Sequence, residues 1–509
     1  MLARIWSASL IGINALKVGV EVDLSGGLPS VVVVGLPDTA IQESRERVKA
    51  ALKNAGYPFP MRKVVVNLTP ADVRKEGPIY DLPIAIGILA ASDLVNQQGL
   101  NDYLLIGELS LDGGLRAIAG VVAIAAAASS LGIKGLILPK ANAPEAAVVP
   151  GLSVYGFDTI SQVVEFLNHP ESVKPLTVDG QRALATASPH AVDLRDVKGQ
   201  AQARRALEIA AAGGHNLIFV GPPGSGKTML ARRLSTILPA LNFQEALEVT
   251  QIHSVAGLLR EKGRLITERP FRSPHHSASG PSLVGGGTFP KPGEISLAHR
   301  GVLFLDELTE FNRKVLEFLR QPLEDGYVSI ARTRQSVEFP AQFTLVASTN
   351  PCPCGFFGDS VQACTCSSHQ RETYWARLSG PLMDRIDLQV AVNRLKPEEI
   401  THHRLGEDSA AVRQRVEAAR KMARQRFQGI DKLQCNADIE SRHLRQWCQL
   451  DDSSRTLLET AVRRLGLSAR ATDRILKVSR TIADLAQADS IDTPHVAEAI
   501  QYRTIDRLQ

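Results

Sequence analysis

The 509-residue sequence has little excess charge, few cysteines and no hydrophobic run suited to crossing a bilayer. Lys and Arg outnumber Asp and Glu by only 58 to 53, so a surface for a polyanion would have to be local. The six cysteines lack the spread of a secreted disulfide framework. The Ala-rich run at 117–128 is too short and too weakly apolar to span a membrane. Lys17 and Glu21 interrupt the apolar N-terminus, which alternates late as a strand does and carries no convincing signal-peptide cleavage site. These absences predict a soluble, cytoplasmic protein.

The sequence is predicted to form an α/β multidomain protein. Residues 1–170 alternate strand-like runs, such as 30–36, 63–68 and 135–139, with helical ones. Periodicity fades over 171–190, which indicates a linker. A second α/β block covers 191–395. From 396 to 509 the sequence has only amphipathic, Arg-rich helical patterns, which predict a helical lid.

The second block contains NLIFVGPPGSGKTML, an apolar strand followed by a glycine-rich turn and a helical pattern. The glycines let backbone N–H groups face phosphate oxygens, the lysine reaches the β and γ phosphates, and the threonine hydroxyl binds Mg²⁺. The strand before this motif and the helix after it favour a nucleotide site over a chance match. The predicted nucleotide-binding residues are Gly221, Pro222, Pro223, Gly224, Ser225, Gly226, Lys227 and Thr228.

Two further strands in this block end in polar residues. VLFL is followed by Asp306, which is predicted to hold Mg²⁺ together with Thr228, and by Glu307, which is predicted to activate the attacking water. The strand FTLVAST ends at Asn350, which is expected to orient that water. Alone, such residues are more often solvated, but their spacing from the phosphate loop favours catalysis.

Arginines near the end of this block and in the helical tail are candidates for contacts with nucleotide in addition to those of the phosphate loop. Arg385, between Asp384 and Asp387, is either a surface residue in local ion pairs or an arginine finger for a neighbouring subunit's nucleotide. In the helical tail, Arg470 begins a helix and is predicted to reach the same chain's nucleotide, with Arg474 as the alternative.

Two inserted segments are candidates for contacts with a substrate. GYVSIARTRQSVEF predicts a hairpin with Arg332 and Arg334 near its tip, where in a ring they would grip DNA phosphates in the pore without reading sequence. An ordinary solvated turn is the alternative. The segment PHHSASGPSLVGGG is predicted to be a flexible pore loop rather than a metal site, because adjacent His side chains seldom converge on one ion.

Four cysteines lie close together just after Asn350, as Cys352, Cys354, Cys364 and Cys366. Two Cys-x-Cys pairs brought together by a reversal at GFFGDS offer four thiolates to one Zn²⁺, with His369 as a reserve ligand. Idle thiols, an iron–sulfur cluster and a disulfide are the alternatives, and the spacing alone does not decide between them.

The order of these motifs resembles that of an AAA+ ATPase, and AHRGVLFLDE and LSGPLMDRID resemble its magnesium-chelatase branch. Within that branch, RSPHHSASGPSLVGGGTFPKPGEISLAHRG and the region through TNPCPCG are similar to the bacterial ComM/YifB family. The resemblance covers nearly the whole chain. It implies a hexameric ring that uses ATP and Mg²⁺ to translocate on DNA, as a helicase promoting branch migration in natural transformation.

Residues 1–170 resemble the proteolytic domain of Lon through TPADVRKEGPIYDLPIAIGIL and IGELSLDGGLRAIAG. Lon-type proteases need a Ser and a Lys at positions held here by Ile79 and Val122, so the resemblance implies the fold without the protease chemistry. A chelatase-type motor and a protein-remodelling motor are the alternative functions. The Lon-like segment and the cysteine cluster, both foreign to a chelatase motor subunit, favour the DNA motor.

Overall fold

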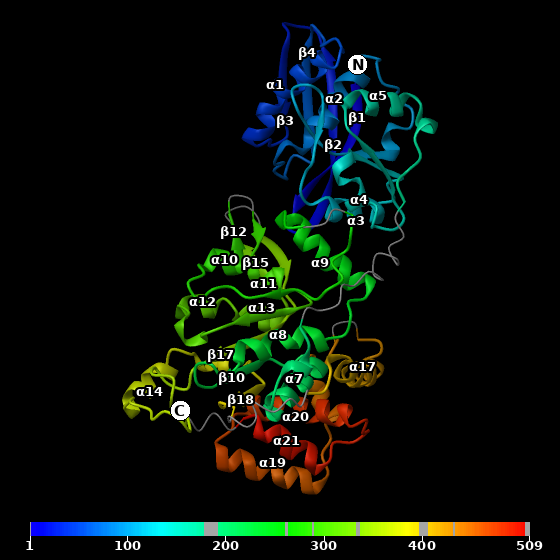
Figure 1. The fold of residues 1–509 in the computed structure, drawn as a ribbon. Helices are drawn as coiled ribbons and strands as arrows, with labels where there is room; N and C mark the ends of the chain where they lie inside the picture. Colours follow the sequence, from blue (N-terminus) through cyan, green and yellow to red (C-terminus); the bar gives the residue numbers. More distant parts are fainter. Residues whose placement is uncertain are drawn as a thin grey trace.

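The computed structural model describes residues 2–177, 192–259, 263–287, 290–331, 336–395, 406–430 and 433–503. Figure 1 shows an N-terminal α/β part in blue and cyan, a central α/β part in green, and a helical C-terminal part in orange and red. Most of the predicted linker, from 178 onward, lies outside the described residues. Within the described ranges, no helix has both the length and the apolar character needed to cross a membrane.

The N-terminal part is built on one mixed sheet. β1 pairs antiparallel with β2, β2 pairs antiparallel with β4, and the other neighbouring strands run parallel. Alternate residues of β4 are buried, as a period of two requires. The runs predicted at 30–36, 63–68 and 135–139 are strands, and the N-terminus is a full hairpin rather than one late strand. The sheet order is β3 (Ser30–Val34), β4 (Lys63–Thr69), β2 (Asn14–Ser25), β1 (Leu2–Ile11), β5 (Tyr103–Leu105), β8 (Gly135–Pro139) and β9 (Ser153–Phe157).

Helices of this part pack on the sheet through apolar side chains. The α1 helix begins after Asp38, whose carboxylate accepts the Ile41 N–H at 2.8 Å. Every residue of α2 is buried, so this helix is the centre of the N-terminal core. The helices are α1 (Thr39–Asn54), α2 (Asp81–Ala91), α3 (Val121–Ser130), α4 (Ala143–Ala146) and α5 (Ile160–Asn168).

The central part is a five-stranded sheet in which all neighbouring strands run parallel. Because the strands are parallel, their carboxyl ends lie at one edge, and the loops that leave them meet there. The β10 strand lies between β17 and β18, which places the phosphate loop beside the residues that follow β17. The sheet order is β11 (Phe271–Arg272), β14 (Val302–Leu305), β17 (Thr344–Thr349), β10 (Leu217–Val220) and β18 (Leu388–Ala391).

Helices of different lengths and two β-ribbons surround the central sheet. The ribbons are β12 (Gly285–Gly286) with β13 (Lys291–Pro292), and β15 (Tyr327–Ala331) with β16 (Ser336–Pro340). The helices of this part are α7 (Ala201–Gly213), α8 (Lys227–Ile237), α9 (Phe243–Ala256), α10 (Gly280–Val284), α11 (Glu294–Leu297), α12 (Arg313–Glu317), α13 (Arg320–Asp325), α14 (Ser368–Trp375) and α15 (Gly380–Met383).

Helix α9 belongs to the central part by sequence but packs against α3 of the N-terminal part (Figure 1). Ala246 and Val249 of α9 belong to the same buried cluster as the N-terminal strands. Ser254 donates its hydroxyl to Glu145, and its carbonyl accepts the Gly120 N–H at 3.1 Å. The N-terminal core therefore extends beyond residue 170, and α9 ties it to the central part.

The C-terminal part is a helical bundle that packs on α7 through α17 and α20. Its amphipathic helices bury one face each, as the sequence predicted. Arg426 and Arg480 both form ion pairs with Asp484, which is fully buried between these helices. The helices are α17 (Ser409–Arg426), α18 (Ser441–Trp447), α19 (Asp452–Leu465), α20 (Ala469–Leu485) and α21 (Thr493–Gln501).

Candidate functional site

The glycine-rich loop connects β10 to α8 at the carboxyl edge of the sheet. Gly224 and Gly226 have φ angles of +78° and +92°, which side chains other than glycine rarely adopt. A Cβ on Gly221 would lie 2.0 Å from the carbonyl oxygen of Val392. The loop ends where Lys227 begins α8, so the free N–H groups of this helix face the loop. The backbone is therefore shaped for an anion such as a phosphate.

Lys227 is held inside this loop. Its Nζ donates to the carbonyl oxygens of Gly221 at 2.6 Å and Pro222 at 3.0 Å, and to Oδ1 of Asn350 at 3.2 Å. Burial lowers the pKa of Lys227, against the attraction of nearby carboxylates. Asn350 reaches the lysine because β17 and β10 are adjacent parallel strands. The structure thus brings together the predicted phosphate-binding lysine and the predicted water-orienting asparagine.

The two residues predicted to hold magnesium are also in contact. Thr228 donates its hydroxyl to Oδ2 of Asp306 at 2.8 Å, and the hydroxyl of Ser348 donates to Oδ1. Hydroxyl and carboxylate oxygens are the ligands that Mg²⁺ prefers, so these residues fit that ion. Ser348 was not predicted from the sequence, because a serine inside an apolar strand gives no signal of its own.

Glu307 has an unusual backbone conformation and an unexpected neighbour. Its φ angle is +53°, in the left-handed region that non-glycine residues seldom occupy. His276 places Nδ1 3.4 Å from Oε2 of Glu307, and the ring of His275 lies over that of His276 with centroids 4.0 Å apart. The segment predicted as a pore loop therefore contacts the candidate catalytic carboxylate, which the sequence did not indicate.

Arg385 lies between α15 and β18, with its side chain only 7% exposed. It forms an ion pair with Glu324 of α13 and donates to the Pro381 carbonyl, while its Nε has no partner among the described residues. Neither flanking aspartate pairs with it, contrary to the local ion pairs that the sequence offered as the alternative to a finger. Within one chain, Glu324 neutralises the guanidinium of Arg385.

Asp387 is the centre of a buried polar network that joins the central sheet to the lid. It forms an ion pair with Arg474 of α20, accepts the Asn216 N–H, and lies 3.2 Å from Nδ1 of His215. The other ring nitrogen of His215 lies 2.7 Å from the hydroxyl of Thr481. Burial alone would raise the pKa of Asp387, but the charge of Arg474 and the bond from His215 hold it well below its usual range. Arg474, the alternative nucleotide contact, is therefore used in this network.

Replacing Asp387 with Ala is expected to weaken the attachment of α20 to the central sheet, because it leaves Arg474 without its partner. We expect the free energy of local opening of α20, measured by hydrogen exchange, to fall by about 3 kcal/mol or more. In the unchanged protein the low pKa of Asp387 stabilises the fold above pH 4 or so, and this contribution is lost as the pH falls below about 4, the value for an unfolded chain.

Asp384→Ala is the matched control for this experiment. Its carboxylate is 41% exposed and lies 4.0 Å from Arg470, so the expected change is below about 1 kcal/mol. Equal effects of the two substitutions would contradict the role given to Asp387.

Arg470 lies at the edge of the sheet opposite the phosphate loop. Its neighbour Asp384 precedes β18, and the Asp387 N–H bonds the Asn216 carbonyl just before β18 and β10 begin. The phosphate loop follows the other end of β10, about 13 Å away for a strand of four residues. The side chain of Arg470 is 73% exposed. The contact of Arg470 with the same chain's nucleotide, which the sequence suggested, stays a prediction.

The predicted hairpin between the strands β14 and β17 is present. Strands β15 and β16 pair antiparallel, with Ala331 opposite Ser336 at the last described pair. Arg332 and Arg334 themselves lie outside the described residues. Their contact with DNA stays a prediction.

The four clustered cysteines converge in space. The Sγ atoms of Cys352 and Cys354 are 3.3 Å apart, and each lies 3.6 Å from that of Cys364. With Cys366, all four sulfur atoms lie within 4.8 Å of one another. No disulfide joins them, and the set is complete without His369, which is exposed on α14.

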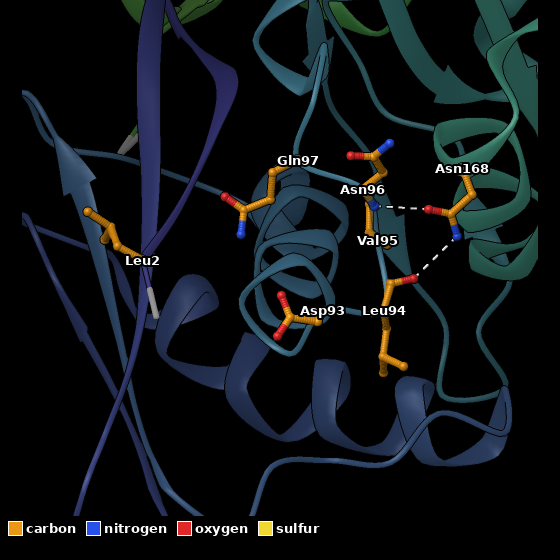
Figure 2. Close-up of a pocket in the computed structure, with 7 residues that line it drawn as sticks. All are labelled: Leu2, Asp93, Leu94, Val95, Asn96, Gln97 and Asn168. Carbon is orange, nitrogen blue, oxygen red and sulfur yellow. Dashed lines mark hydrogen bonds between the residues drawn. The ribbon is translucent and has the colours of Figure 1, made fainter.

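Both positions of a Lon-type dyad in the N-terminal part hold buried apolar side chains. Ile79 lies in the turn before α2, and Val122 lies in α3 with no exposed surface. A pocket elsewhere in this part is lined by Asp93, Asn96 and Asn168, with Asn168 bonded to the Asn96 N–H and the Leu94 carbonyl (Figure 2). Asp93 is the only ionisable residue that lines it, so this pocket does not offer a nucleophile with its base.

Most of the chain matches families of magnesium-chelatase subunits. Residues 193–400 match the family described as magnesium chelatase, subunit ChlI, and residues 406–503 match its C-terminal region. Residues 20–142 match a family described as subunit ChlI of magnesium chelatase. This last match weakens the sequence argument that the N-terminal part is foreign to a chelatase motor.

Full-length relatives narrow the assignment. The chain is 47% identical to "Competence protein ComM" of Haemophilus influenzae and 46% identical to "Uncharacterized protein YifB" of Escherichia coli, each over 100% of this chain and 98% of the relative. It is 28% identical to "Lon protease 2" of Bacillus subtilis over 34% of this chain and 36% of that protein. The chain therefore belongs to the ComM/YifB family of magnesium-chelatase-like AAA+ proteins.

Proposed function

We propose that this protein is a motor that hydrolyses ATP to move along DNA. The observation that supports this proposal is a pair of contacts at one edge of the sheet. Lys227 bonds Asn350 there, and Thr228 bonds Asp306. Lys227 would bind the β and γ phosphates, Asn350 would orient the attacking water, and Glu307 would accept its proton. Thr228 and Asp306 would hold Mg²⁺, and the ion would supply positive charge to offset the charge that develops on the transferred phosphate.

The proposed motor is a ring of identical copies, with six as the expected number from the family resemblance. Arg385 and Arg470 both lie at the edge of the sheet opposite the chain's own phosphate loop. From that edge an arginine acts on nucleotide only if a neighbouring copy brings its own loop there. A ring of head-to-tail contacts provides this arrangement at every interface. The ion pair of Arg385 with Glu324 would open when the neighbour's nucleotide arrives.

DNA is the proposed substrate, and branch migration during natural transformation is the proposed task. The name of the Haemophilus relative supports a role in competence, and the β15–β16 hairpin supports a contact with phosphates. The proposed site of action is the cytoplasm. The proposed cofactors are ATP and Mg²⁺, with a structural Zn²⁺ at the cysteine cluster.

A chelatase-type motor that acts on a protein partner is the second candidate. The description of the family matched by residues 20–142, together with the 25% identity to "Magnesium-chelatase 38 kDa subunit" of Cereibacter sphaeroides over 30% of this chain, favours it. A protein-remodelling motor is a third candidate, and the buried Ile79 and Val122 weigh against a proteolytic form of it.

The ATPase rate in the presence of DNA distinguishes these candidates. We expect single-stranded, double-stranded or branched DNA to raise the rate, with an effect that weakens as salt increases. Replacing Arg332 and Arg334 with Ala should weaken DNA binding equally across sequences. It should also reduce the log–log salt slope by about one unit for each phosphate that the variant no longer binds.

A charge-matched control is the replacement of Arg442 and Arg455 on the lid, which are exposed and paired with Glu440 and Asp452. DNA binding by this variant should stay near that of the unchanged protein. If no form of DNA stimulates the rate, the chelatase-type or protein-remodelling motor becomes the preferred function.

A further inference from the structure

The cysteine cluster has the dimensions of a metal site. In a tetrahedral Zn²⁺ site with Zn–S bonds near 2.3 Å, the sulfur atoms lie about 3.8 Å apart. The separations of 3.3 and 3.6 Å among the sulfur atoms of Cys352, Cys354 and Cys364 are close to this value and far from the covalent distance of a disulfide. Thiolates repel one another and thiols form only weak hydrogen bonds, so a cation among the four sulfur atoms would stabilise their close approach.

Backbone N–H groups point at three of these sulfur atoms. The Phe357 N–H donates to Cys352 Sγ and the Cys354 N–H to Cys366 Sγ, both at 3.3 Å, and the Cys366 N–H donates to Cys364 Sγ at 3.4 Å. Such donors stabilise the charged form of sulfur, which is the form that binds a metal. Two of the three donors belong to the Cys-x-Cys pairs, one to each pair, and the third lies between the pairs.

The segment that carries the cysteines has few buried residues, and polar contacts anchor it, among them the ion pair of Asp359 with Arg394 and the bond from Arg371 to the Cys366 carbonyl. Residues 350–367, all of them described, contain no helix or strand. The buried residues among them are Pro351, Cys352 and Gly355, and Val361 is 75% exposed. A metal cross-link would add a strong constraint to a segment that otherwise has a small apolar core and a few polar contacts.

This segment lies against the phosphate loop. A Cβ on Gly355 would lie 2.8 Å from Cδ of Pro223 and 3.9 Å from Cγ of Asn350, so the backbone of Gly355 touches the proline ring. On its other side, Nε1 of Trp375 donates to the Pro351 carbonyl at 3.1 Å. The cysteine segment is thus positioned between α14 and the loop that would bind phosphates.

We propose that Cys352, Cys354, Cys364 and Cys366 bind one Zn²⁺, and that this ion fixes Gly355 as a support for Pro223 of the phosphate loop. Soft thiolate ligands in a tetrahedral set select zinc over the hard cations that oxygen ligands bind. Only the second half of the proposal, the support of the nucleotide site, depends on the proposed function.

The metal is tested directly on the full-length protein. We expect about one zinc per chain by metal analysis, and the charge-transfer absorption of a tetrathiolate site after replacement of zinc by Co²⁺. Cys352→Ser with Cys364→Ser should lose both signals. Cys435→Ser with Cys448→Ser, which removes the other two cysteines of the chain, should keep both.

The contact with the phosphate loop is tested with two glycine variants. Gly355 and Gly358 have φ angles of +87° and +78°, so alanine is similarly strained at both, but only at Gly355 would its Cβ meet Pro223. Both variants should retain zinc. Gly355→Ala should weaken binding of a fluorescent ATP analogue about tenfold, whereas Gly358→Ala should bind it as the unchanged protein does.

Each half of the proposal has its own contrary result. Zinc well under half an equivalent in freshly reduced protein, or a coloured protein that contains iron and sulfide, would overturn the metal site. Equal nucleotide binding by Gly355→Ala and Gly358→Ala would overturn the support of the phosphate loop. If the unchanged protein binds zinc but no ATP analogue, the proposed function fails while the metal site stands.

Discussion

Glu307→Gln is expected to stop ATP turnover while leaving nucleotide bound. Glutamine keeps the size and polarity of the side chain but cannot accept a proton, so only the activation of water is lost. A positioned general base contributes about a hundredfold to ten-thousandfold to such a rate, and we expect a loss in that range. Steady-state phosphate release, together with the affinity for a fluorescent ATP analogue, measures the two effects separately.

Two further variants test whether the loss of turnover in Glu307→Gln is specific to that carboxylate. Lys227→Ala should lose both turnover and tight binding, because Lys227 is the cation at the loop. Glu310→Gln changes the same chemical group three residues from Glu307, in an exposed pair with Arg377, and should leave turnover within about twofold. Full turnover by both Glu307→Gln and Lys227→Ala would refute the assignment of the site.

The residues that sequence could assign are those whose position follows from local structure. The glycine-rich loop lies between a strand and a helix, and Asp306 and Asn350 directly follow strands, so parallel pairing alone brings them to one edge. Ser348 and His276 could not be assigned in this way. The contact of His276 with Glu307 depends on how a separate segment folds over the edge of the sheet. Ser348 lies beside Asp306 through the β14–β17 pairing, but a serine inside an apolar run gives no signal of this contact in the sequence.

The contacts of Arg470 and Arg474 and the packing of α9 could not be predicted from the sequence, because they depend on residues far apart in the chain. The pairing of Arg474 with Asp387 joins residues far apart in the chain, and it leaves Arg470 exposed at the edge away from the phosphate loop. Likewise, nothing in the sequence of α9 indicates which domain it packs in, and only the folded structure shows it in the N-terminal core. The pattern of a strand or helix lies in neighbouring residues and can be recognised in the sequence. The residues that it packs against lie elsewhere in the chain and cannot be recognised in the same way.

Arg385→Ala is expected to lose turnover, and a mixture with Glu307→Gln protein is expected to regain part of it. In the mixture, an interface works when the chain with Glu307 supplies the nucleotide site and the chain with Arg385 supplies the arginine. For random mixing in equal amounts, about one interface in four has this composition. Phosphate release by each variant alone and by the mixture gives the comparison.

The complementation is informative because Arg385 is buried against Glu324 within its own chain. Loss of turnover by itself would also follow if removal of Arg385 left Glu324 unpaired and disturbed α13. A merely damaged fold cannot be repaired by a second inactive chain, whereas a missing arginine can be supplied across an interface. Arg320 begins α13, and Arg320→Ala, which breaks its pair with Glu317 of α12, should keep turnover near the level of the unchanged protein. No recovery in the mixture would mean that Arg385 acts within its own chain or supports the fold alone.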